Sequence, residues 1–223
     1  MFSVAIDGPA GAGKSTIART AAAEFGFIYV DTGALYRTIA LACIECGADV
    51  QDADAVTALL PQLQIRLVYQ DAVQRVLLND RDVSDMIRTE QVSMSASLVS
   101  RIPGVRAFLL HLQRQLAQEQ SVIMDGRDIG TVVLPEANVK IFLTASPESR
   151  ADRRLLQLQQ QGEKADYEAI YRDIVQRDEQ DMHRVVAPLK QAEDAVVLDT
   201  TEMTLEQSIR AVCEIIRKGM DEK

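Results

Sequence analysis

The sequence predicts an α/β fold in which a parallel five-stranded sheet is flanked by helices. Two observations favour it: short β-branched runs alternate with longer segments of helical periodicity, and each run is apolar at almost every position. Strands that alternate with helices form parallel sheets, and a run without polar alternation is typical of a strand buried on both faces. The five runs are Phe2–Ile6, Phe27–Val30, Ser121–Met124, Val139–Leu143 and Ala195–Leu198.

Length and composition limit the possible functions. The 223 residues, 47% of them hydrophobic, suffice for one large domain or two small ones with a buried core. A formal net charge of −9 argues against a protein that binds nucleic acid or acidic membranes through a general positive field. No apolar run approaches ~18 residues, and the first residues lack the features of a signal peptide. We therefore expect a cytoplasmic protein with no nucleic-acid partner and no membrane partner.

Three cysteines, Cys43, Cys46 and Cys213, cannot all pair with one another, which favours a reducing compartment. The first two are spaced as in some metal or redox motifs. Because they lie in an apolar stretch of helical character without a second pair of ligands, we interpret them as small buried residues.

Start signals mark three of the predicted helices. One helix runs from Ser15 to Phe25, directly after the first run and a glycine-rich loop. Ser146–Glu148 supplies an N-cap, a proline at the first helical position and an early acid. Thr204–Gln207 resembles a capping box, and apolar residues follow it at intervals of three and four, as one buried helix face requires.

A long segment between the second and third runs breaks the alternation. Gln64–Tyr69 and Val73–Leu78, joined through Gln70–Ala72, predict an antiparallel hairpin. We expect residues 34–119 to form an insertion with its own small sheet and helices. The core domain would then comprise residues 1–33, 120–149 and 185–223, and residues 150–184 would form a short lid with its flanking helices.

Gly8–Ser15 has the pattern Gly-x-x-x-x-Gly-Lys-[Ser/Thr] of a phosphate-binding loop. Its glycines allow backbone N–H groups to turn toward a phosphate at a helix N-terminus, where the helix dipole favours negative charge. Lys14 would reach the β- and γ-phosphates of a nucleotide, and the Ser15 hydroxyl would bind Mg²⁺. Asp125, directly after the third run, resembles the acid that lies near this ion. The motif predicts a P-loop NTPase fold.

Four of the five runs are followed at once by an aspartate. Ligands of open parallel sheets bind beyond the carboxyl ends of the strands, so Asp7, Asp31 and Asp125 mark the expected functional edge. Asp199 is interpreted as the start of a turn.

The chain has 18 arginines and 6 lysines, and the planar fork of arginine suits phosphates and carboxylates. The Asn-Lys-x-Asp signature of regulatory GTPases and the Leu-Ser-Gly-Gly-Gln signature of ABC-type ATPases are absent. Small-molecule kinases of this fold instead need a second anionic pocket, which predicts positioned arginines. Candidates are Arg37, with Thr32 expected to cap its helix; Arg127 beside Asp128; Arg177, Asp181 and Arg184 on one stripe of a predicted helix; and Arg150, Arg153 and Arg154. Solvated ion pairs or surface arginines remain the alternative for the last two groups.

Six motifs, in order along the chain, resemble those of the bacterial cytidylate kinases. They are Gly8–Thr16, Asp31–Arg37, Ile87–Glu90, Asp125–Thr131, Val139–Leu143 and Arg184–Leu189. The resemblance covers nearly the whole chain. It implies a nucleoside monophosphate kinase that uses Mg²⁺ and transfers the γ-phosphoryl group of ATP to CMP and dCMP. It also implies that residues 34–119 are an enlarged monophosphate-binding insertion.

The resemblance assigns roles position by position. Cytosine would be read by Ser97, Arg106 and Arg184, and Asp128, Asp181 and Arg177 would contact ribose and phosphate. The whole CMP set is Thr32, Arg37, Ser97, Arg106, Asp128, Arg177, Asp181 and Arg184. The ATP set is Gly8, Pro9, Ala10, Gly11, Ala12, Gly13, Lys14, Ser15, Thr16 and the lid residue Arg154. The catalytic set is Lys14, Arg127, Arg150 and Arg177, and Ser15 and Asp125 would hold Mg²⁺, directly or through water.

Two alternatives stay open. The chain could be another small-molecule kinase of this fold, acting on UMP, dTMP, shikimate or gluconate. A nucleotide-binding switch without a small acceptor is the second alternative, and the arginine-rich second pocket argues against it. We expect a monomer because no apolar surface stripe remains after the helices are placed.

Overall fold

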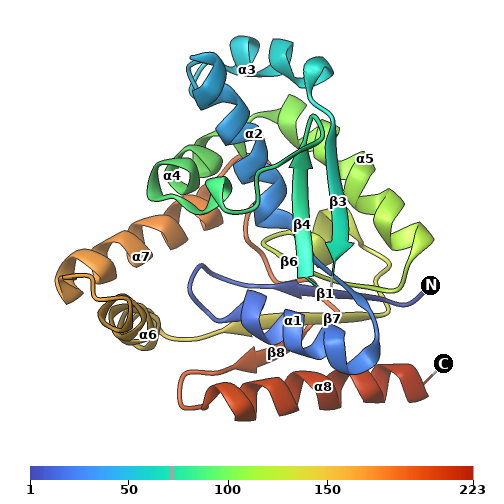
Figure 1. Ribbon diagram of the computed structural model, residues 1–223. Helices are drawn as coiled ribbons and strands as arrows, with labels where there is room; N and C mark the ends of the chain where they lie inside the picture. Colours follow the sequence, from blue (N-terminus) through green and yellow to red (C-terminus); the bar gives the residue numbers. More distant parts are fainter. Residues whose placement is uncertain (71–72, 223) are drawn as a thin grey trace. The chain divides into compact units, whose positions relative to one another are not determined.

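The computed structural model describes residues 1–70 and 73–222, and its central feature is a five-stranded parallel sheet (Figure 1). The strands are β1 (Ser3–Asp7), β2 (Ile28–Asp31), β6 (Val122–Gly126), β7 (Val139–Thr144) and β8 (Val196–Asp199), in the order β2-β6-β1-β7-β8. All five predicted strands are confirmed, with ends that differ from the prediction by one or two residues.

The central strands are apolar because both of their faces are covered. Val4, Ala5 and Ile6 of β1 are fully buried. β1 pairs in parallel with β6 on one side and with β7 on the other, with Ala5 opposite Met124 and Lys140. The register brings the carboxyl ends of β1 and β6 level, since Ile6 is opposite Asp125. The chain segments that follow these two strands therefore emerge at the same edge.

The chain divides into two compact units. The sheet unit comprises Met1–Ile28 and Gln120–Lys223, and the insertion unit comprises Tyr29–Glu119. Besides strands, the sheet unit contains α1 (Lys14–Phe25), the π-helical turn η3 (Ile129–Val133), α6 (Pro147–Gln160), α7 (Tyr167–His183) and α8 (Leu205–Asp221).

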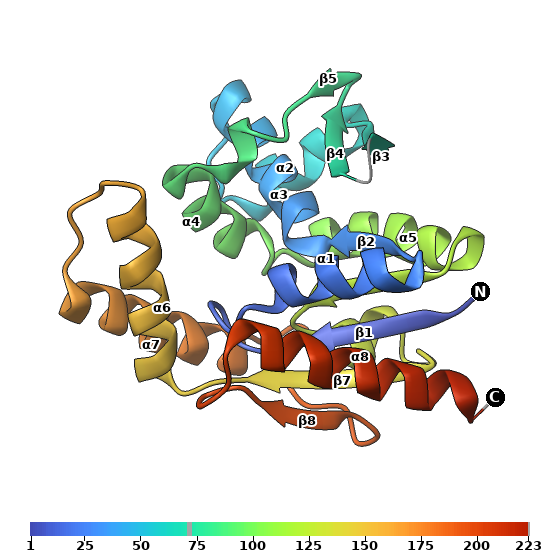
Figure 2. The ribbon, with the colours of Figure 1, turned by 60° about the horizontal axis from the view of Figure 1, so that its bottom comes forward.

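The helices of the sheet unit pack in two pairs. Helices α1 and α8 contact each other, and α1 also contacts β6 while α8 contacts β7, so this pair covers one face of the sheet (Figure 2). Helices α6 and α7 pack against each other and are joined by a turn in which Gly162 has φ +78°. Among the described residues, no helix is both long enough and apolar enough to cross a membrane.

The insertion unit has its own hydrophobic core around one helix. Helix α2 (Thr32–Cys46) packs against α4 (Glu90–Val99), α5 (Pro103–Glu119) and β4 (Val73–Leu78). The remaining elements are α3 (Ala53–Leu59), η1 (Leu60–Gln62), β3 (Ile65–Gln70), β5 (Arg81–Asp82) and η2 (Met86–Arg88). The core consists of buried residues from α2, α4, α5 and the small sheet, such as Leu35, Ile39, Val76, Val99 and Leu109.

The predicted hairpin is confirmed, because β3 and β4 pair antiparallel with Ile65 opposite Leu78. Its predicted connection falls partly on residues 71 and 72, which lie outside the described residues. The third strand of this sheet, β5, was not predicted, since two residues carry too little pattern to be recognised.

The cysteines are all free, and one prediction about them is wrong. Cys43 is fully buried in the core of the insertion unit, as expected. Cys46 is exposed instead, because it is the last residue of α2 and is followed by the helix-ending residue Gly47. The helical period placed Cys43 on the buried face but could not place a residue at the end of the helix.

The capping box predicted at Thr204 is present and gives a stability test. The Thr204 hydroxyl accepts a hydrogen bond from the backbone N–H of Gln207, whose side-chain oxygen accepts one from the backbone N–H of Thr204. We expect Thr204→Ala to lower the free energy of unfolding by about 1 kcal/mol, measured by urea denaturation. Thr20→Ala, within exposed α1 surface, is the control and should cost nothing measurable. Equal stability of the two variants would contradict the capping role.

Candidate active site

The glycine-rich loop after β1 adopts backbone conformations that other residues disfavour. Gly8, Gly11 and Gly13 have φ values of +151°, +75° and +86°. A Cβ atom on Gly8 would lie 1.9 Å from the carbonyl oxygen of Leu143, so no side chain fits there. Gly13 is the N-cap of α1, and no side chain in the described part of the chain caps this helix start. The loop therefore opens onto a helix N-terminus suited to an anion.

Lys14 is buried at the start of α1 and donates a hydrogen bond from Nζ to the carbonyl oxygen of Pro9 at 2.7 Å. Burial holds the pKa of Lys14 well below its usual value, and the nearby charge of Arg127 lowers that pKa further, against the opposing effects of Asp125 and Asp7. A buried lysine beside the partly exposed Arg127 forms a place where a bound anion would be favoured.

Ser15 and Asp125 meet beside the loop. The Ser15 hydroxyl donates to Asp125 Oδ2 at 2.8 Å, and Asp125 is itself buried near the end of β6. These are hard oxygen ligands of the kind that Mg²⁺ prefers. In residues 1–70 and 73–222, no group of three or more His, Cys, Asp or Glu residues could hold a metal by itself. The Ser15–Asp125 pair nevertheless fits Mg²⁺, which usually combines one or two protein ligands with substrate phosphates and water.

Asp7 joins the end of β1 to the chain after β6. Its two carboxylate oxygens accept hydrogen bonds from the backbone N–H groups of Ile129 at 2.8 Å and Gly130 at 2.7 Å. Burial raises the pKa of Asp7 to about 6, although both hydrogen bonds act in the opposite direction. Asp7 thereby fixes the start of η3, immediately after Arg127 and Asp128.

Two arginines of the sheet unit pair with carboxylates next to η3. Arg127 donates from Nε to Asp181 Oδ2 at 2.8 Å, and Arg184 Nη2 lies 3.3 Å from Asp128 Oδ1. Burial tends to raise the pKa of Asp181, but the charges of Arg127 and Arg184 outweigh it and the net shift is downward.

The prediction that Arg184 lies on a helical stripe with Arg177 and Asp181 is wrong. Helix α7 ends at His183, and Arg184 has the extended backbone conformation φ −65°, ψ 140°. Its Nη2 contacts Asp128, and its Nε donates to the carbonyl oxygen of Ala187 at 2.5 Å. Arg177 does lie on α7, where its charge contributes to the low pKa of Asp181.

Arg150 is almost completely buried on α6 and is held by four hydrogen bonds. It donates to both carboxylate oxygens of Asp178 on α7, at 3.0 and 2.5 Å. It also donates to the carbonyl oxygens of Ala145 and of Ala10 in the phosphate loop, each at 2.9 Å. Arg154, on the same helix, instead contacts the exposed side chain of Gln157.

The insertion unit contributes the other predicted CMP-contacting residues, which lie on α2 and on two helices that pack against it. Thr32 and Arg37 are on α2, Ser97 is on α4, and Arg106 is on α5 with its guanidinium 5.7 Å from the ring centroid of Tyr36. The prediction that Thr32 caps α2 is wrong. Asp31 is the N-cap and accepts a hydrogen bond from the backbone N–H of Ala34, while Thr32 is the first helical residue.

Comparison with known proteins gives one consistent family. The family model described as cytidylate kinase matches residues 4–218. The cytidylate kinase of Carboxydothermus hydrogenoformans is 46% identical over 218 residues, which cover 98% of each chain. That of Leuconostoc mesenteroides is 47% identical over 219 residues, again covering 98% of each chain. The chain belongs to the cytidylate kinase family.

As a cytidylate kinase, the protein is a nucleoside monophosphate kinase that uses ATP. Similarity in structure extends further than similarity in sequence. A gluconokinase from Sinorhizobium meliloti superimposes with a TM-score of 0.51 at 13% identity, covering 99% of this chain and 94% of that one. At this identity the likeness concerns the fold alone, and it supports the P-loop kinase architecture predicted from Gly8–Ser15.

Sequence reasoning missed two members of this cytidylate kinase's charge network. Asp178 pairs with Arg150 across α6 and α7, and Arg88 donates from Nη1 to Asp31 Oδ2 at 3.0 Å. Asp178 stands three residues before Asp181 on one helix, a spacing that signals a shared face. Arg88 belongs to the family motif Ile87–Glu90 but received no role.

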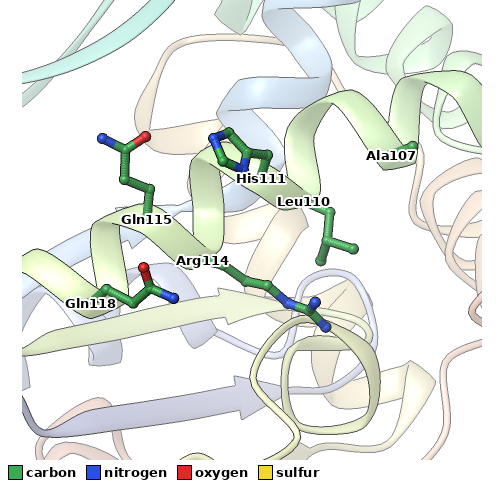
Figure 3. A pocket seen from close by; sticks show the side chains of 6 residues that line it. All are labelled: Ala107, Leu110, His111, Arg114, Gln115 and Gln118. Carbon is green, nitrogen blue, oxygen red and sulfur yellow. The ribbon is translucent and has the colours of Figure 1, made fainter.

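A hollow of about 440 Å³ lies along α5 and is separate from the residues predicted to bind nucleotides (Figure 3). Its lining residues all come from this one helix. They are Ala107, Leu110, His111, Arg114, Gln115 and Gln118. We give this hollow no part in the chemistry, because it contains neither the phosphate loop nor a paired carboxylate and arginine.

The raised pKa of Asp7 predicts a pH-dependent stability. Asp7 holds its proton up to about pH 6 in the folded chain but loses it near its ordinary value of 3.8 when unfolded. The folded state therefore binds more protons in this window, and the contribution of Asp7 to stability decreases as the pH rises through it. Relative to Asp7→Asn, wild type should lose about 2 kcal/mol of unfolding free energy between pH 4 and pH 7.

Chemical denaturation at the two pH values measures this difference. Asp199→Asn is the control, because Asp199 also ends a strand but is exposed and caps only the local turn at Thr201. The free energy of unfolding of this control should change between pH 4 and pH 7 as that of wild type does. A difference between wild type and Asp7→Asn that does not change with pH would contradict the raised pKa.

Proposed function

We propose that this cytidylate kinase transfers the γ-phosphoryl group of ATP to CMP and dCMP by positioning and electrostatic stabilisation. The observation that carries this proposal is the glycine-rich loop that opens onto the N-terminus of α1, with buried Lys14 as the first residue of that helix and Arg127 near enough to lower its pKa. A transferring phosphoryl group carries negative charge, which Lys14 and Arg127 would stabilise. The acceptor phosphate is already anionic near neutral pH, so the reaction needs no general base.

For the donor, we propose that ATP binds residues 8–16 and Arg154, with Lys14 on its β- and γ-phosphates. The open N-terminus of α1 and the three positive φ values of the loop support this assignment. Ser15 and Asp125 would hold Mg²⁺, which supplies neutralisation of the phosphate charge when it is bound. Arg150 would reach ATP only after its guanidinium exchanges Asp178 and Ala10 for phosphate, since both hold it in the unliganded chain.

For the acceptor, we propose that each unit supplies its own set of contacts. In the sheet unit, Arg127 and Arg177 bind phosphate, Asp128 and Asp181 bind ribose, and Arg184 reads the cytosine edge. In the insertion unit, Thr32 and Arg37 bind phosphate, and Ser97 and Arg106 read the base. Arg37 supports this assignment because its Nε is buried and has no hydrogen-bond partner in the described chain.

We also propose that the enzyme is a cytoplasmic monomer. Its three free thiols suit a reducing compartment. The exposed large apolar residues of the described chain are spread over several elements, among them α4 with Met94, α6 with Leu156 and β8 with Val196 and Val197, which does not favour a single self-association surface.

Activity against a panel of acceptors tests the proposed reaction. With ATP and Mg²⁺, turnover should be highest with CMP and dCMP, and lower with UMP, dTMP, shikimate and gluconate. Lys14→Ala should reduce turnover of CMP by at least about a hundredfold, because the charge on the transferring phosphoryl loses its nearest cation. The circular dichroism spectrum should be unchanged. Near-normal turnover by folded Lys14→Ala would contradict the catalytic role of the loop, and slow ATP hydrolysis indifferent to every acceptor would favour a switch.

Arg184 provides a separate test of base selection. Replacing it by methionine leaves cytosine without a donor at a desolvated position, which should reduce the preference for CMP over UMP about ten- to a hundredfold. The KM for ATP should stay within about twofold of wild type. The ratio of kcat/KM values for CMP and UMP measures the effect. An unchanged ratio would remove Arg184 from base recognition.

A further inference from the structure

Asp31 is the point at which three parts of the insertion unit meet. Its Oδ1 accepts the backbone N–H of Ala34 at 2.9 Å and so caps α2. Its Oδ2 accepts from Arg37 Nη2 at 2.8 Å and from Arg88 Nη1 at 3.0 Å. With hydrogen bonds on both oxygens, the carboxylate cannot rotate without breaking a helix cap or an ion pair. One buried side chain thus fixes two guanidinium groups relative to the first turn of α2.

The backbone at Gly33 completes this arrangement. A Cβ on Gly33 would lie 3.1 Å from Arg37 Nη1 and 3.2 Å from Asp31 Oδ1, both closer than ordinary packing allows. The Arg37 guanidinium therefore lies directly against the first turn of the helix, in space that a larger residue at position 33 could share only if Arg37 or Asp31 shifted. Its Nη2 is engaged with Asp31, and its Nε is buried without a partner in the described residues. The guanidinium is thus held through Nη2, while Nε keeps a hydrogen-bonding capacity that nothing in the described chain uses.

The charges indicate why an acid is tolerated beside an anion site. Burial alone would raise the pKa of Asp31, but Arg37 and Arg88 outweigh it and the net shift is downward, so Asp31 is ionised at neutral pH. The pair of arginines still leaves one net positive charge. An aspartate here weakens the attraction for a phosphate, so its presence calls for a compensating benefit. Orientation of a long, flexible side chain is such a benefit.

We propose that Asp31 is a positioning residue for the CMP phosphate: it sets the Arg37 guanidinium, together with Arg88, in the orientation in which Arg37 receives the acceptor. The inference rests on the proposed role of Arg37 and deepens it. Asp31 itself touches no substrate. Its effect should appear in the affinity for CMP and leave the affinity for ATP unchanged.

Asp31→Asn separates positioning from helix capping. Asparagine is as good an N-cap as aspartate, so the bond to Ala34 can persist while the ionic hold on both arginines is lost. We expect the KM for CMP to rise about tenfold and the KM for ATP to stay within about twofold of wild type. A purely structural defect would instead reduce the amount of active enzyme and lower kcat without this split. Asp31→Ser, a second neutral cap, serves if the asparagine variant folds poorly.

Asp52→Asn is the matched control. Asp52 is also an N-cap aspartate of the insertion unit, accepting from the backbone N–H groups of Asp54 and Ala55, but it is exposed and pairs with no arginine among the described residues. This variant should leave both KM values unchanged. If Asp31→Asn behaves like the control, or lowers the KM for CMP by relieving charge repulsion, the positioning role is wrong.

A double-mutant cycle with Arg37→Ala distinguishes this inference from the proposed function. If Asp31 acts through Arg37, Asp31→Asn should raise the KM for CMP by a clearly smaller factor in the Arg37→Ala variant than in wild type. An equal fold-increase in the KM for CMP in both backgrounds would overturn the inference. If Arg37→Ala itself does not change the KM for CMP, the proposed phosphate contact fails. Absence of CMP turnover in wild type would contradict the proposed reaction.

Discussion

A lysine ammonium buried beside a glycine-rich loop is the constraint on which the sheet unit depends. Taking a charge out of water costs several kcal/mol unless it is paired and hydrogen-bonded. Lys14 has a carbonyl oxygen of the loop as its hydrogen-bond partner, with Asp7 and Asp125 as opposite charges and Arg127 as a like charge. The parallel pairing of β1 with β6 brings Asp7 and Asp125 to the same edge of the sheet, and Asp7 also holds the start of η3. A nucleotide phosphate would complete the balance.

Aspartate carboxylates balance the charge of arginines that are removed from water. Arg127, Arg150, Arg184 and Arg37 each contact an aspartate, and the aspartates come from β2, α7 and the start of η3. A buried ion pair adds little net stability, but breaking it leaves an uncompensated charge and costs much more. The pairs therefore hold the guanidinium groups in place between turnovers. The net charge of −9 is consistent with a phosphate-binding protein, because part of the acid content orients the cations of its site.

The central strands were predictable because burial on both faces leaves an unbroken apolar run, and the phosphate loop because its backbone admits only glycine at fixed positions. In the edge strand β8 the same pattern was wrong about burial, since Val196 and Val197 are exposed. The end of one helix, the choice of one N-cap and an ion pair between helices were not predictable from local sequence patterns. The seven-residue spacing of Arg177 and Arg184 fits a helix equally well whether the helix continues or stops, and it stops at His183. Asp31 and Thr32 are both good N-caps, and the ion pairs of Asp31 accompany the choice between them. The pairing of Arg150 with Asp178 joins two helices, and no local pattern records it.

Part of the excess of arginine over lysine fits what the arginines of the candidate site do, while others, such as Arg66 and Arg210, form exposed ion pairs. An ammonium concentrates its charge at one point, so a carboxylate bound there competes directly with a phosphate. A guanidinium has separate edges, and Arg37 shows the consequence: Nη2 is held by Asp31 while Nε is left without a partner in the described residues. A guanidinium can thus keep one nitrogen on an acid while another nitrogen, fixed in the same plane, has no partner. Lys14, by contrast, is held by the carbonyl oxygen of Pro9 in the loop, with Asp7 and Asp125 as nearby opposite charges.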